Sequence, residues 1–207
     1  MPVLRFTNPN CSFVRIPKTG STSIRKGLLR NAKQIQRIES NDQFAPERDD
    51  QFSFAFVRDP VSRFQSAVQM FQRYPTRSWK ERWQRRCLTI DRVLDIVEDQ
   101  SIPLFETTFL SKVRLHHIPM THPTLMLQHA RYLADFDNFH NEVEHIASKL
   151  GIVSPEIPHL RKNDRKVPSP VLNDVTKERF LKVYRSDLEF YQRFSQSKVA
   201  AGDADKQ

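Results

Sequence analysis

The sequence has little cysteine and no long apolar run. Its two cysteines, Cys11 and Cys87, lie far apart and match neither a disulfide framework nor the spacing of a metal site. We therefore expect free thiols in a reducing compartment. No apolar run approaches the roughly 20 residues of a membrane span, and the first residues lack the charged-then-apolar pattern of a signal peptide. These absences predict a cytoplasmic protein without membrane insertion.

The length and charge of the chain fit one basic domain. The chain has 207 residues, of which 38% are hydrophobic and 15 are phenylalanine, which is enough for an ordinary core. We expect a single domain over residues 1–194, followed by a polar, disordered tail over 195–207. The formal net charge of +9 favours anionic partners without choosing among them.

The pattern of apolar residues predicts an α/β fold. Candidate strands are 12–16, 33–38 and 52–57, and we expect the last to be central because it is the most apolar. Candidate helices are 22–30, one opened by Pro60, two within 79–97, then 138–150 and 175–194. Residues 101–117 show no clear period. This order predicts a P-loop-like three-layer domain with a central, mainly parallel sheet flanked by helices.

One loop, "PKTGSTS", follows the first candidate strand and precedes the first candidate helix. Such a loop suits an anion, because the first backbone N–H groups of a helix have no partner inside it. Gly20 permits a close backbone approach and Lys18 adds a positive charge. The candidate phosphate-binding residues are Pro17, Lys18, Thr19, Gly20, Ser21, Thr22 and Ser23. A simpler interpretation, an N-cap by Ser21 or Thr22, explains one hydroxyl but not four.

The loop is not a Walker A motif, because that motif places its Lys after the second Gly. Here Lys18 precedes Gly20, which disfavours an ordinary ATP or GTP hydrolase.

The second candidate segment is "FAFVRDPVSRFQSAV". Arg58 follows the most apolar strand, at the sheet edge where open α/β folds bind ligands. Ser66 lies on the next helix, on the same face as Arg63. An Arg and a Ser can hold a phosphate monoester by charge-assisted hydrogen bonds. The alternative is a surface ion pair of Asp59 with Arg58 or Arg63.

Together these two segments resemble the nucleotide motifs of the sulfotransferases, in particular the carbohydrate branch that includes heparan and chondroitin sulfotransferases and their bacterial relatives. "RIPKTGSTS" is similar to that branch's loop for the 5′-phosphosulfate of 3′-phosphoadenosine-5′-phosphosulfate. "FVRDPVSRFQSAV" is similar to its 3′-phosphate motif, which implies Arg58 and Ser66 as the ligands of that phosphate.

The resemblance covers most of the chain up to Phe194, apart from 79–117. In the C-terminal half, "HPTLMLQ", "DFDNFHNEVEHIASKLGI" and "PHLRKNDR" resemble segments that close over the nucleotide. The last of these implies His159, Arg161 and Lys162 near the nucleotide.

Catalysis by in-line transfer suits these residues. Negative charge builds on the leaving phosphate oxygen, where Lys18 can stabilise it, and no metal is required. Several relatives place a His or Glu between the two motifs as the general base, but 34–51 contains no His here. Glu39 follows a candidate strand at the expected edge, so we choose it as the base. Asp42, Glu47 and His122 remain alternatives.

The basic run "RYPTRSWKERWQRRC" has two interpretations. We expect Trp79 and Trp83, four residues apart, to pack inward, which would leave Lys80, Arg82, Arg85 and Arg86 exposed. The run is then either a solvated helix face or a site for a sulfated or carboxylated acceptor. The spacing of His116, His117 and His122 matches no zinc template, so we expect no metal.

The leading hypothesis is a sulfotransferase acting on a hydroxyl, or secondarily an amine, of a carbohydrate or other small acceptor. The alternatives are a non-catalytic nucleotide- or polyanion-binding domain and an ATP-dependent P-loop-like kinase. The presence of both candidate phosphate segments favours the enzyme over a polyanion-binding domain, because non-specific polyanion binding needs neither segment. No nucleic-acid-binding signature stands out, and the oligomeric state is not readable from the sequence.

Overall fold

A computed structural model describes residues 3–38, 51–153 and 171–204 of the chain. Their contacts form two compact units. One unit holds the β-sheet with α1 (Ser21–Lys26), α6 (Phe139–Lys149) and two short 3-10 turns, η2 (Pro123–Leu125) and η3 (Leu127–His129). The other unit is helical. No helix in the described ranges has the length and apolar character needed to cross a membrane.

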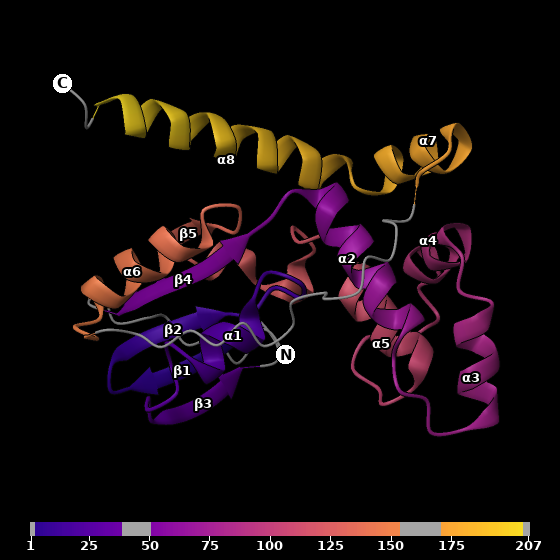
Figure 1. Cartoon of the computed structure of the whole chain (residues 1–207), viewed down its shortest axis with the longest axis horizontal. Helices are drawn as coiled ribbons and strands as arrows, with labels where there is room; N and C mark the ends of the chain where they lie inside the picture. Colours follow the sequence, from indigo (N-terminus) through magenta and orange to yellow (C-terminus); the bar gives the residue numbers. More distant parts are fainter. Residues whose placement is uncertain (1–2, 39–50, 154–170, 205–207) are drawn as a thin grey trace. The chain divides into compact units, whose positions relative to one another are not determined.

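The sheet has five strands in the order β3-β1-β2-β4-β5 (Figure 1). The strands are β1 (Val3–Thr7), β2 (Asn10–Val14), β3 (Gln34–Ile38), β4 (Phe52–Val57) and β5 (Tyr132–Asp135). β4 pairs in parallel with both β2 and β5, whereas β1 runs antiparallel to β2 and β3. This mixed sheet with a mostly parallel core and flanking helices confirms the predicted α/β class.

Three strands lie close to their predicted positions, and two were not predicted. β1 and β5 were missed; β5 has only four residues, too few to show an alternating pattern. The prediction that 52–57 is central was wrong, because β2 occupies the middle of the sheet. β4 is strongly apolar because it has neighbours on both edges and its residues from Ser53 to Val57 are buried.

The helical unit contains six helices among the described residues. They are α2 (Pro60–Gln72), α3 (Trp79–Arg86), α4 (Ile90–Glu98), α5 (Phe109–His117), α7 (Asp174–Val183) and α8 (Arg185–Ala204). α5 lies in the region that had no readable period. The predicted helix 175–194 is two helices, separated at Tyr184.

The chain remains helical beyond residue 194, where the sequence predicted a disordered tail. α8 continues to Ala204. No proline interrupts this segment, and its Gln, Lys and Ala residues favour helix despite their polarity. The expectation of a single domain over 1–194 stays a prediction.

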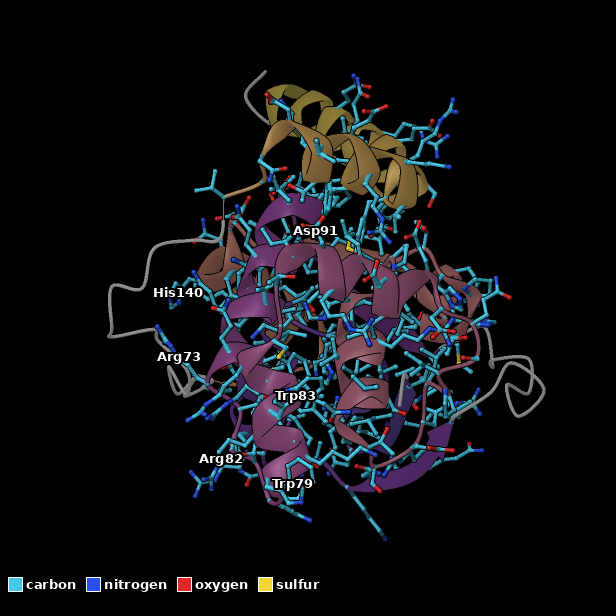
Figure 2. The ribbon with its side chains drawn as sticks, turned by 90° about the vertical axis from the view of Figure 1, so that its right-hand side faces the viewer. Arg73, Trp79, Arg82, Trp83, Asp91 and His140 are labelled. Atoms are coloured by element: carbon cyan, nitrogen blue, oxygen red, sulfur yellow. The ribbon has the colours of Figure 1, made fainter. Side chains whose placement is uncertain are left out.

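The two tryptophans of α3 do not pack inward as predicted. Trp79 is 81% exposed and Trp83 is 62% exposed, and Figure 2 labels both on this helix. α3 has no buried residue, and the core of the helical unit comes from its other elements, with α2 supplying Phe64, Val68 and Phe71. The inward prediction was wrong because a spacing of four residues shows that two side chains share a helix face, not that this face is buried.

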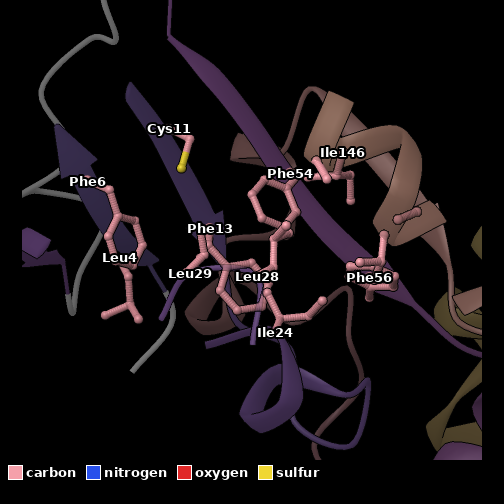
Figure 3. Packing of buried hydrophobic residues seen from close by; sticks show 13 residues of the cluster. Leu4, Phe6, Cys11, Phe13, Ile24, Leu28, Leu29, Phe54, Phe56 and Ile146 are labelled. Carbon is pink, nitrogen blue, oxygen red and sulfur yellow. The ribbon is translucent and has the colours of Figure 1, made fainter. Parts of the chain in front are cut away.

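One face of the sheet carries the core of the sheet unit (Figure 3). Phe13 of β2 stacks on Phe54 of β4 with ring centroids 4.9 Å apart. Ile24 of α1 (Ser21–Lys26) and Ile146 of α6 (Phe139–Lys149) pack against this face. Each large apolar side chain buried in this way contributes about 1.5–3 kcal/mol. This packing holds α1 against the sheet, and so fixes the loop that joins β2 to α1.

Candidate functional site

The two predicted phosphate segments emerge at the same edge of the sheet. β2 and β4 are parallel neighbours, with Val14 in register with Ala55. The loop before α1 follows the carboxyl end of β2, and Arg58 follows the carboxyl end of β4. Arg58 donates from Nη1 to the carbonyl oxygen of Lys18 at 3.2 Å. This bond brings together two motifs that lie 40 residues apart.

The N-cap alternative for the loop is wrong. Gly20, not Ser21 or Thr22, is the N-cap of α1, and it makes no side-chain cap bond; its carbonyl accepts from Ile24 N at 3.1 Å. The half-buried hydroxyls of Ser21, Thr22 and Ser23 make no side-chain hydrogen bond within the described ranges. Together with the backbone N–H groups of the first turn, they can serve as donors to a phosphate.

Thr19 differs from the other three hydroxyl residues. Its side chain is fully buried and donates from Oγ1 to the carbonyl oxygen of Ile16 at 2.9 Å. This bond closes the loop on itself. A contact of Thr19 with a phosphate must therefore come from its backbone N–H.

Lys18 adopts a left-handed backbone conformation with φ 68°. For a residue with a side chain, this conformation costs about 1–2 kcal/mol. Such strain persists where surrounding contacts hold it, and it concentrates at functional sites. Here the Arg58 bond to the Lys18 carbonyl is one of those contacts.

Two phenylalanine rings, of Phe136 and Phe139, pack against the loop at Gly20. A Cβ atom on Gly20, which has φ 75°, would lie 2.7 Å from the ring of Phe139 and 3.1 Å from that of Phe136. Only glycine fits both the conformation and the space. The Arg58 guanidinium lies over the Phe136 ring, 4.6 Å from its centroid, in a cation–π contact.

A backbone hydrogen bond fixes the position of Phe136. Phe136 N donates to Val57 O at 2.9 Å, which continues the pairing of β4 with β5 by one residue. The sequence analysis missed both phenylalanines as site residues. The segment "DFDNF" shows two aromatic residues three apart beside a helix start, but the pattern does not indicate that they face Gly20.

The site lies in a strongly positive part of the chain. Residues 1–38 contain eight Lys and Arg residues and no Asp or Glu. Burial lowers the pKa of Arg15, and the nearby charges of Arg25 and Arg37 lower it further. Among the residues that the structure describes, Nε of Arg15 is buried and has no hydrogen-bond partner. This environment favours an anion at the loop.

The start of α2 shows which of its polar residues have structural roles. Asp59 caps the helix, with Oδ1 accepting from Ser62 N at 2.7 Å. The predicted surface pair of Asp59 with Arg63 is wrong, because Arg63 is fully buried and donates to Ile118 O at 2.7 Å. Ser66 is half-buried on α2 in the helical unit, whereas Arg58 belongs to the sheet unit. Their joint contact with a 3′-phosphate stays a prediction.

Several predicted site residues lie outside the described ranges. They are Glu39, Asp42, Glu47, His159, Arg161 and Lys162. The other base candidate, His122, caps η2 by accepting from Thr124 N at its Nδ1, 3.2 Å away. Nδ1 of His122 thus has a structural role in this turn, and a catalytic role for His122 stays a prediction.

The histidines of α5 are held by the helix itself. His116 and His117 bond through Nδ1 to the carbonyl oxygens of Lys112 and Val113, at 2.8 and 2.7 Å. Within 3–38, 51–153 and 171–204, no group of three or more His, Cys, Asp or Glu side chains could hold a metal ion. The two cysteines are free thiols, as predicted; Cys11 is buried and Cys87 is exposed.

The chain matches the model of a known protein family. A family model described as "Sulfotransferase family" matches residues 4–195, which include both predicted phosphate segments and the whole sheet except Val3. Neither the curated proteins nor the solved structures give a match to the chain.

Proposed function

The chain belongs to the sulfotransferase family, so it is a transferase of sulfuryl groups, and we propose that its donor is 3′-phosphoadenosine-5′-phosphosulfate. The proposed acceptor is a hydroxyl of a carbohydrate or other small molecule, with an amine as the second choice. The proposed compartment is the cytoplasm.

One contact carries the donor assignment. The hydrogen bond from Arg58 Nη1 to the Lys18 carbonyl joins the two segments that resemble the 5′- and 3′-phosphate motifs. A nucleotide with phosphates at both positions needs two anion sites at one sheet edge. A helix N-cap alone would supply only one. The Arg58 guanidinium is planar and positively charged, which suits a phosphate monoester.

Each residue then has a distinct role. The hydroxyls of Ser21, Thr22 and Ser23 and the N–H groups of their turn bind the 5′-phosphate, while Arg58 and Ser66 bind the 3′-phosphate. When bound, the donor supplies the sulfuryl group and a phosphate leaving group. The Lys18 ammonium stabilises the charge that develops on the bridging oxygen.

The remaining proposed contacts complete the reaction. Glu39 accepts the proton of the acceptor hydroxyl. His159, Arg161 and Lys162 contact the nucleotide from the C-terminal half. The positive charges of Arg25 and Arg37 act on Arg15, and this group of cations favours an acceptor that is itself anionic.

The test is calorimetric titration with 3′,5′-adenosine bisphosphate, ATP and 5′-AMP, without magnesium. We expect micromolar binding only when the 3′-phosphate is present, and a strong loss of affinity in Arg58→Ala. Arg30→Ala, at an exposed cation beyond α1, is the matched control and should bind normally. Equal binding of all three nucleotides would refute the donor assignment. Binding of ATP that requires magnesium would favour a kinase instead.

A further inference from the structure

The segment from Arg73 to Cys87 concentrates positive charge on the helical unit. It holds six Lys and Arg residues and one acid, Glu81. The acid has a structural role, because its Oε2 accepts from Arg77 N at 2.7 Å at the start of α3. Arg85 is also structural, since its Nη1 donates to Tyr74 O at 2.9 Å. These two bonds hold α3 against the preceding turn.

The exposed residues of α3 follow a helical period. Trp79, Arg82, Trp83 and Arg86 have the spacing i, i+3, i+4 and i+7, which places them on one face. In a helix of a globular domain this face would hold apolar core residues. Here all four side chains are exposed, with 81% of Trp79 and 62% of Trp83 accessible to solvent.

Three further exposed cations lie close to this face in the sequence. Lys80 lies beside Trp79, and Arg73 and Arg77 precede the helix; all three are exposed. Figure 2 shows Arg73, Trp79, Arg82 and Trp83 along the helix and its approach. We name the set the basic tryptophan face; it consists of Arg73, Arg77, Trp79, Lys80, Arg82, Trp83 and Arg86.

We propose that the basic tryptophan face docks this protein on the surface of an anionic phospholipid bilayer. Indole rings favour the headgroup region, where their apolar part is buried and their N–H is solvated. Lys and Arg bind lipid phosphates and respond to the negative surface potential. Indole and guanidinium groups alternate on one helix face, so a bilayer surface that contacts this face would meet both kinds of group.

The chemistry of the face favours a lipid surface over a carbohydrate. Sugar hydroxyls are recognised by groups that accept hydrogen bonds as well as by donors. The only carboxylate of the segment, Glu81, already accepts from Arg77 N. The segment therefore offers six cations and two exposed indoles against a single carboxylate, a composition that favours an anionic surface with an apolar layer over neutral sugar hydroxyls. This is surface docking and requires no spanning helix.

The chain contains a natural probe for this proposal. Trp79 and Trp83 are its only tryptophans, so selectively excited tryptophan fluorescence reports on α3 alone. We expect a blue shift when vesicles of phosphatidylcholine and phosphatidylglycerol are added, and quenching by brominated lipid. Vesicles of phosphatidylcholine alone should give little shift. High salt should reverse the binding, because it screens surface charges.

Matched variants distinguish the effect of the basic tryptophan face on vesicle binding from the effect of the net charge of the chain. Arg82→Glu/Arg86→Glu keeps both indoles and should bind anionic vesicles roughly thirtyfold more weakly or worse. Lys177→Glu/Lys182→Glu makes the same charge change at exposed positions of α7 and should bind almost normally. Trp79→Ala should also weaken binding, and the remaining Trp83 still reports on it. Circular dichroism checks that each variant folds.

Two results would overturn the proposal. One is the absence of a blue shift or quenching with anionic vesicles in the unmodified chain. The other is an equal loss of binding in the α7 variant, which would show that only net charge matters. A shift with a sulfated polysaccharide but not with vesicles would assign the face to a polyanion. Titration with 3′,5′-adenosine bisphosphate on the same variants tests the donor separately.

Discussion

Arg63 of α2 and Asp187 of α8 form a fully buried ion pair, with Nη2 and Oδ2 3.6 Å apart and neither side chain exposed. Nη2 of Arg63 also donates to the carbonyl oxygen of Ile118 at 2.7 Å. The pair thus ties two helices of the helical unit to the end of α5. Removing one partner leaves a charge buried without compensation, which typically costs about 3–5 kcal/mol.

We therefore expect Arg63→Met and Asp187→Asn each to lower the free energy of unfolding by about 3–5 kcal/mol. Urea unfolding followed by circular dichroism measures this. The control is Arg185→Ala, which removes an ion pair with Glu189 whose side chains are 82% and 56% exposed. It should cost less than about 1 kcal/mol. Equal effects in the buried and exposed pairs would contradict the assignment.

Gly20→Ala should damage both stability and nucleotide binding, because the new Cβ would lie 2.7 Å from the Phe139 ring. Gly151→Ala is a close control: Gly151 also has a positive φ, of 66°, but nothing lies within 4 Å of its Cβ position. The control should lose about 1–2 kcal/mol from conformation alone. Gly20→Ala should lose about 1–3 kcal/mol more from overpacking. Thermal unfolding and titration with 3′,5′-adenosine bisphosphate measure the two effects.

Lys18→Ala should abolish sulfuryl transfer while leaving most of the affinity for 3′,5′-adenosine bisphosphate. The reason is that the Lys18 ammonium acts on charge that develops in the transition state, whereas the neighbouring hydroxyls and Arg58 bind the ground state. A coupled transfer assay and calorimetry on the same preparation separate the two. Normal turnover in Lys18→Ala would remove this residue from catalysis.

Glu39→Gln should strongly reduce transfer, since an amide cannot accept the proton of the acceptor hydroxyl. The measurement is kcat against pH for the native chain and the variant, with Asp42→Asn and Glu47→Gln as matched controls. Undiminished turnover in Glu39→Gln together with a loss in one of the controls would move the base to that residue.

Cys11 and Cys87 should differ sharply in reactivity. Burial raises the pKa of the Cys11 thiol from 9.0 to about 12, so it stays a protonated, unreactive thiol at neutral pH. Mass spectrometry after iodoacetamide treatment should find only Cys87 modified in the native chain, and both thiols modified in urea. The raised pKa also means that stability falls as pH rises from about 9 to about 12, because the unfolded chain loses this proton first. Rapid modification of Cys11 in the folded chain would contradict its burial.

The sequence predicted the parts of the site that lie in continuous segments. The loop at 17–23, Arg58 and the helix opened by Pro60 were all readable, because turn chemistry and apolar runs are local signals. The sequence could not show that Phe136 and Phe139 contact Gly20, because contacts between segments so far apart in the chain leave no local pattern. Nor could it distinguish an exposed Trp pair on α3 from a buried one, since both have the same spacing.

The sequence by itself determined the α/β class, the candidate phosphate loop with its Lys and four hydroxyl residues, and the strongly basic character of the chain. These follow from local propensity and composition. Only the tertiary structure decided that β2 is the central strand, that Thr19 and Arg63 are structural, and that Arg58 holds the Lys18 backbone. Strand pairing, burial and hydrogen-bond partners depend on what each segment meets across the fold, and that is settled only when the core packs.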